Sequence, residues 1–200
     1  MKKLLKLTAF FLVAFLGLST VSLIRDRRML DTGLVRLHVV GASDSEVDQA
    51  EKLRVRDAVL EYVRCLGIPE NAPEAKRLLE ENLSGITDAA NRALGGRNTA
   101  AVTLCREAFP IREYDSFTLP SGVYDSLRVR IGEAAGRNWW CVVFPSLCVP
   151  AAGETMESVA AGAGFSENLT QTITAEQYTV SFFLLDLLGK AESFFFSLFH

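Results

Sequence analysis

The fold is decided by residues 34–66, which read LVRLHVVGASDSEVDQAEKLRVRDAVLEYVRCL. Residues 34–40 alternate apolar side chains with Arg36 and His38, the period of a half-buried β-strand. Residues 41–45 are glycine, alanine, serine and aspartate, which predict a turn that also caps the next helix. Helical spacing of apolar residues then continues to the end of the quoted stretch and forms one wide apolar face. The domain therefore begins with a strand, a short turn and a long helix.

The rest of the middle of the chain also predicts helices and strands. A second helical region begins at Pro73 and ends at the glycines 95–96. Strand patterns follow over 101–109, 123–131 and 139–144. Their short loops predict an antiparallel meander, which the first strand joins by a helical crossover. We therefore expect an α+β fold with a small, mostly antiparallel sheet of about four strands, packed with two to three helices. A signal or anchor helix precedes it, and a linker and an apolar strand or helix follow.

Apolar residues concentrate at the two ends of the chain. Of its 200 residues 49% are hydrophobic, with 16 in residues 1–24 and 13 in residues 180–200. The residues between them have an ordinary globular composition. The formal net charge of −3 argues against broad electrostatic binding of nucleic acid, which needs many basic residues on one face.

The N-terminus has the pattern of an export segment. Three lysines precede the uncharged residues 7–24, and three arginines and an aspartate follow them. As a helix these residues would span about 27 Å, close to the thickness of the hydrocarbon core of a bilayer. No Ala-x-Ala cleavage motif is present, so the pattern fits a cleaved signal peptide and a retained anchor equally. The expected organisation is a signal or anchor (1–24), an extracytoplasmic α+β domain (31–149), a linker (150–179) and an apolar C-terminal strand or helix (180–200).

Export would place the four cysteines where disulfides persist. Cys141 and Cys148 flank the end of a strand and a proline turn, so they form either a disulfide or two buried free thiols. We predict no metal site and no cofactor. There is no Cys-x-x-Cys motif, and His38 and His200 are the only histidines.

The sequence contains no enzyme signature that we can identify. His38, Ser43 and Asp44 are the residue types of a hydrolase triad, but triads assemble in space and closeness in sequence is no evidence for one. A nucleophile elbow, a His-Glu-x-x-His motif and a phosphate-binding loop are all absent. The simpler interpretation makes Asp44 a turn residue and His38 a hydrogen-bonded structural histidine.

Two other groups of residues favour binding. Arg54, Arg56 and Asp57 form either a solvated helix face or, through an Arg56–Asp57 pair, a lock between helix and sheet. Trp139 and Trp140 are neighbours in a predicted strand and therefore point to opposite faces. One belongs in the core, and the other either covers a helix or is an exposed interface anchor.

Several blocks, in order along residues 34–149, resemble the stage II sporulation protein R family. The blocks are Val35-Arg-Leu-His38-Val-Val, Ser43-Asp-Ser45, Asp48-Gln49, Lys52-Leu-Arg-Val-Arg-Asp57-Ala-Val-Leu60, Phe109-Pro110, Leu119-Pro120-x-Gly122-x-Tyr124-x-x-Leu127-Arg128-Val129 and Gly136-x-Asn138-Trp139-Trp140-Cys141-Val-x-Phe144-Pro145-x-Leu147-Cys148. The resemblance implies a signalling protein of endospore-forming bacteria that is exported into the space between the two septal membranes. There such proteins trigger a membrane-embedded aspartic protease that processes the precursor of sigma-E. The family offers no catalytic residues to carry over.

The sequence thus predicts a secreted activator that works by binding, through one face of the domain or the Phe-rich tail. The partner implied is the extracytoplasmic region of the protease, with no nucleic acid and no small-molecule substrate. Membrane contact would occur during export or through an anchor retained at residues 7–24. The rival hypotheses are an exported cell-wall hydrolase that uses His38 and Asp44, and a passive membrane-tethered structural protein. The candidate partner-binding residues are Arg36, His38, Asp44, Arg54, Arg56, Asp57, Trp139 and Trp140.

Overall fold

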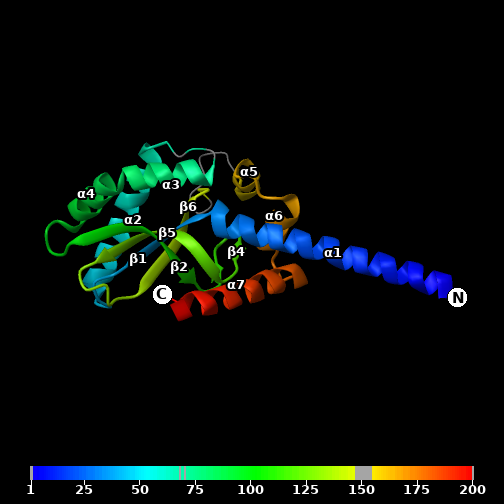
Figure 1. Cartoon of the computed structure of the whole chain (residues 1–200). Helices are drawn as coiled ribbons and strands as arrows, with labels where there is room; N and C mark the ends of the chain where they lie inside the picture. Colours follow the sequence, from blue (N-terminus) through cyan, green and yellow to red (C-terminus); the bar gives the residue numbers. More distant parts are fainter. Residues whose placement is uncertain (1, 68, 70, 147–154, 200) are drawn as a thin grey trace.

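The computed structural model describes residues 2–67, 69, 71–146 and 155–199. Figure 1 shows a sheet with helices packed around it and one long helix, α1, that projects from the domain. The elements are α1 (Lys2–Gly33), β1 (Val35–Val40), α2 (Glu46–Cys65), α3 (Ala72–Glu81), α4 (Leu83–Leu94), β2 (Ala100–Phe109), β3 (Arg112–Glu113), β4 (Thr118–Leu119), β5 (Gly122–Ile131), β6 (Asn138–Phe144), α5 (Met156–Gly162), α6 (Glu167–Thr174) and α7 (Val180–Phe199).

The main sheet is mixed and has the strand order β2-β5-β1-β6. Strand β5 is antiparallel to β2 and parallel to β1, and β1 is antiparallel to β6. The predicted α+β class with four strands is confirmed, but the predicted meander is wrong because β1 lies between β5 and β6. The crossover through α2, α3 and α4 separates β1 from the later strands in the sequence. The local spacing of apolar residues therefore does not indicate which strands β1 pairs with. All six residues of β1 are buried, so the strand is central rather than half-buried.

Helices α2, α3 and α4 cover one face of the sheet and form the first core with it. Val55, Val59 and Val63 of α2 pack there against Leu37 and Leu127 of the sheet. The helix begins where the sequence predicts, because Ser45 Oγ accepts a hydrogen bond from the backbone N–H of Asp48 at 3.2 Å.

The other face of the sheet carries a second core, which includes residues beyond the predicted domain. The segment 150–179 was predicted as a linker, yet it contains α5 and α6, and Met156, Leu169 and Ile173 are buried. Each helix has eight residues or fewer, so its few apolar residues give too short a period to recognise in the sequence. The apolar tail is a helix, α7, and not a strand.

Helix α1 continues without a break from its apolar part into the second core. It is long and apolar enough, by length and composition, to cross a membrane between Lys6 and Gly33, and its most apolar part is not buried in the protein. Its last turns are different, because Arg27 and Leu30 are buried. Arg27 donates hydrogen bonds to the Ser121 carbonyl (2.9 Å) and to Glu192 Oε2 (2.7 Å). The end of α1 is therefore part of the packed domain.

Candidate partner-binding surface

A groove of about 420 Å³ lies beside β6, at one edge of the sheet. One wall is the β3–β4 turn, residues 112–117, and the other is the start of β6, residues 138–141. Tyr114 and Phe117 stack in the first wall, with ring centroids 4.6 Å apart. The groove thus brings together two segments that lie far apart in the sequence, and it contains both tryptophans of the chain.

Trp140 is the centre of a stack of flat side chains in this groove. Its ring stacks on His38, with centroids 5.5 Å apart and planes at 24°. The guanidinium carbon of Arg112 lies 3.6 Å from the centroid of the same ring, within cation–π range. Burial lowers the pKa of Arg112 from its ordinary value, and the nearby charge of Arg36 lowers it further. The three side chains hold one another in fixed positions, which limits the conformational entropy that a partner's binding would cost.

His38 is fixed by hydrogen bonds at both ring nitrogens. Nδ1 lies 3.0 Å from Glu107 Oε2, and Nε2 lies 2.9 Å from Asn138 Oδ1. Burial raises the pKa of Glu107, but the hydrogen bond from His38 and the positive charge of Arg128 more than offset it. The pKa of Glu107 therefore lies below its ordinary value, and the carboxylate is ionised at neutral pH. His38 is held as a structural histidine would be.

Arg36 lies fully buried beneath this stack. Its guanidinium carbon is 4.2 Å from the ring centroid of Phe109 and 5.0 Å from that of Tyr124. Nη2 donates to the hydroxyl of Tyr114 at 2.6 Å, whereas Nε and Nη1 have no partner. A buried charge with two nitrogens that lack a hydrogen-bond partner costs stability.

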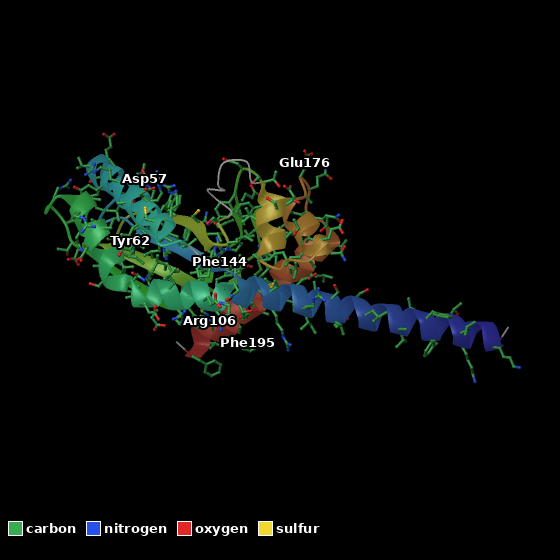
Figure 2. All side chains as sticks on the ribbon, turned by 90° about the horizontal axis from the view of Figure 1, so that it is seen from above. Asp57, Tyr62, Arg106, Phe144, Glu176 and Phe195 are labelled. Carbon is green, nitrogen blue, oxygen red and sulfur yellow. The ribbon has the colours of Figure 1, made fainter. Side chains whose placement is uncertain are left out.

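A second group of predicted residues lies on the opposite face of β6, where the ring of Trp139 packs although the residue also lines the groove. The guanidinium carbon of Arg56 is 5.0 Å from the ring centroid of Trp139, which links α2 to the sheet. Arg56 Nε also donates to Asp57 Oδ1 at 2.7 Å, but the Asp57 side chain is 64% exposed. Figure 2 shows Asp57 on the outer surface of α2. The connection between helix and sheet is therefore made by Arg56 and Trp139, and Asp57 contributes little to it.

Asp44 and Arg54 lie outside both groups. Asp44 Oδ1 accepts a hydrogen bond from the backbone N–H of Arg137 at 2.7 Å, which joins the turn after β1 to the loop before β6. Arg54 is exposed and lies 3.7 Å from Glu51. Because His38 is bonded to other residues than Asp44, the structure does not assemble the pair on which the hydrolase hypothesis depends.

Three residues of the groove network were missed by sequence reasoning: Glu107, Arg112 and Asn138. Glu107 continues the alternation of polar residues on one face of β2, so its position was open to prediction. Arg112 belongs to a strand of two residues, which is too short to show a period. Asn138 pairs with Val40 in the β1–β6 ladder and reaches His38 through its side chain, and that strand pairing was not predicted.

The predicted disulfide involves a residue outside the described part of the chain. Cys141 is buried in β6, but Cys148 lies among the residues that the structure does not describe. The Cys141–Cys148 bridge therefore stays a prediction. Within residues 2–146 and 155–199, as far as they are described, no three His, Cys, Asp or Glu side chains are arranged to hold a metal ion.

The fold and the groove define a small α+β protein with a preorganised aromatic and basic surface, attached to a helix apolar enough to cross a membrane. The chain belongs to the stage II sporulation protein R family, whose model matches residues 31–154. It is 32% identical over 118 residues to stage II sporulation protein R of Bacillus subtilis (strain 168), which covers 57% of this chain and 53% of that protein. The chain thus spans about half the length of this curated relative. No solved structure matches it.

The family match has a clear boundary in the structure. It begins in the last turn of α1 and ends just before α5, so it includes the whole sheet, the groove and the first core. Helices α5, α6 and α7 lie beyond it.

Proposed function

We propose that this protein is a sporulation signal that binds a membrane-embedded aspartic protease and activates it, so that the protease processes the precursor of sigma-E. The observation that carries the proposal is membership of the stage II sporulation protein R family across the whole sheet and groove. The protein acts by binding and supplies no catalytic group. The engagement of His38 with Glu107 and Asn138 supports this, since it leaves neither ring nitrogen without a partner.

The groove beside β6 is the surface that meets the protease. Trp140 offers a large flat anchor, and Arg112 and His38 hold it in place before the partner arrives. Glu113 and Asp115, which are exposed, line the same groove and supply polar contacts at its edge. A partner that is complementary to this surface only in its active arrangement would be shifted towards that arrangement by the difference in affinity.

The protein works outside the cytoplasm, in the space between the septal membranes, and residues 7–24 direct its export. Cleavage of the signal and its retention as an anchor are both compatible with the fold. The buried residues of α1, Arg27 and Leu30, lie after this segment and would stay with the domain in either case.

The proposal is tested by reconstitution in a bacterium that does not sporulate. The full chain, with its own export segment, is produced together with the candidate protease and the sigma-E precursor, and precursor cleavage is followed by immunoblot. We expect cleavage that depends on this chain. Absence of cleavage, with the chain exported and folded, would contradict the proposal.

A matched pair of variants tests the groove. Arg112→Ala removes the guanidinium from Trp140 and should reduce cleavage several-fold. Arg77→Ala is the control, because Arg77 is an exposed residue of α3 that pairs with the exposed Glu81, one turn away. It should leave cleavage unchanged. Equal effects of the two substitutions would place the contact surface elsewhere, while the activation itself would stand.

A further inference from the structure

Helix α7 is apolar on the side that faces away from the domain as well as on part of the side that packs on it. The packed side buries Phe182 and Leu185 together with Asp186 and Gly189, and the outward side is apolar along its whole length. The large apolar side chains of the outward side are 38–77% exposed. Lys190, Ser181 and Ser197 lie at the edges of this side at helical spacing, and not within it. The outward residues, which we call the α7 apolar face, are Val180, Phe183, Leu184, Leu187, Leu188, Ala191, Phe194, Phe195 and Leu198.

The rotation of α7 about its own axis is fixed by specific contacts. Asp186 Oδ1 accepts hydrogen bonds from Ser121 N (2.8 Å) and Ser121 Oγ (2.6 Å). One turn later Gly189 approaches so closely that a Cβ there would lie 1.6 Å from the Ser121 carbonyl oxygen. Glu192 Oε2 then accepts from Arg27 of α1. With these contacts in place the α7 apolar face has to point away from the domain.

The two figures show where this face points. In Figure 1 α7 lies below the C-terminal half of α1, which it contacts. In Figure 2, turned by 90°, α7 runs away from the line of α1, so the two helices cross. Phe195 lies there near the end of α7 that is farther from the N-terminal half of α1, and its ring projects outward from the domain. The α7 apolar face is therefore open on the outside of the domain, next to the helix that is apolar enough to cross a bilayer.

We propose that α7 is an in-plane membrane helix, whose apolar face enters the headgroup and acyl boundary of the bilayer that α1 crosses. Interfacial helices bind in this way, with one apolar face buried in the boundary region. As a helix of 20 residues α7 is about 30 Å long, which gives it an extended contact. It does not cross the bilayer itself, because Asp186, Lys190 and Glu192 interrupt its hydrophobic sequence and are engaged by the domain or by one another.

Lipid is the occupant that the geometry favours, because the α7 apolar face continues the apolar surface of α1. The exposed Arg25 and Arg28 follow the apolar part of α1, where they would meet lipid headgroups. Leu184 and Leu185 of α7 line a crevice of about 830 Å³ together with residues 18–26 of α1. The surfaces of α1 and α7 therefore meet along this crevice. This inference does not depend on the identity of the signalling partner.

The test places a fluorescent label on α7 in a defined membrane. The full chain is reconstituted, one copy per nanodisc, in phosphatidylethanolamine and phosphatidylglycerol with or without brominated acyl chains. An environment-sensitive dye is attached at Phe195→Cys in a background of Cys65→Ser and Cys105→Ser, and peptide mass mapping confirms that neither Cys141 nor Cys148 carries the dye. The matched control carries the dye on the native Cys65, which is exposed on α2, with Cys105→Ser alone. Phe195 is 59% exposed, so its replacement should leave the fold intact.

We expect brominated lipid to quench the dye at position 195 and to leave the dye at Cys65 unchanged. Absence of quenching at position 195, with α1 shown to be inserted, would overturn the proposal. A blue shift at position 195 that appears only when two copies share a disc, without quenching, would identify a contact between copies and would also overturn it.

Discussion

Replacing Arg36 by methionine should change the stability of the protein little and at the same time weaken its signalling. The substitution removes a fully buried charge, two of whose nitrogens have no partner. It loses the hydrogen bond from the charged guanidinium to Tyr114, worth about 1.5–3 kcal/mol, and cation–π contacts with Phe109 and Tyr124, worth together about 2 kcal/mol. An uncompensated buried charge costs about 3–5 kcal/mol. The gain and the loss nearly cancel, so the free energy of unfolding should change by less than about 1 kcal/mol, and the flexible methionine can fill the space.

Urea unfolding of the full chain in detergent micelles, followed by circular dichroism, measures this difference through the midpoint at constant slope. The matched control is Leu37→Met, the neighbouring fully buried residue, where a swap of similar volume should cost less than about 1.5 kcal/mol. A loss of about 2 kcal/mol or more in Arg36→Met, with a normal control, would refute the reasoning and show that the charge is well compensated. If the variant is about as stable as the wild type but no longer triggers precursor cleavage, Arg36 is retained for binding.

Three further predictions concern α7, the groove and the cysteines. Gly189→Ala brings a methyl group against the Ser121 carbonyl and should lower the free energy of unfolding by about 1–3 kcal/mol, with faster hydrogen exchange in α7. The control is Gly162→Ala, whose methyl group meets nothing within 4 Å and which should change the free energy of unfolding by less than about 1 kcal/mol. Equal changes in the two variants would contradict the close contact between Gly189 and Ser121. Because the pKa of Glu107 is lowered in the folded state, its contribution to stability is present above its ordinary value and is lost as the pH falls through the folded pKa. The free-energy difference between wild type and Glu107→Gln should therefore shrink between about pH 6 and pH 3 in urea titrations, and a difference independent of pH would exclude this role. Intact-mass measurement of the exported chain should show a gain of two hydrogens on reduction if the Cys141–Cys148 bridge forms, and an unchanged mass would show free thiols.

The fold could be predicted in its local elements but not in its strand order. Strand β1 and helix α2 follow from alternation, a capping serine and helical spacing, all of which act within a few residues. The insertion of β1 between β5 and β6 depends on which edges meet after a long crossover, and no local pattern encodes it. Helices α5 and α6 were missed because two turns of helix carry too few apolar residues to show a period.

The candidate surface could be predicted only in part, for a related reason. Trp139 and Trp140, as neighbours in a strand, pack against different cores, as alternation requires. The grouping of Trp140 with Arg112 and Glu107 depends on the mixed sheet and on a strand of two residues. Residues that act by contact across chain segments become recognisable only when the topology is known.

The unbroken course of α1 restricts how far a membrane-held copy of this protein can reach. A flexible tether lets a domain sample a volume that grows with tether length. A helix that continues without a break into the core instead fixes the distance between the membrane and the domain. The groove would then stand at one height and one orientation above its own membrane. A receptor in an opposing membrane could be reached only when the two membranes approach to within the dimensions of the folded domain. In that case signalling would report the distance between the membranes as well as the presence of the signal.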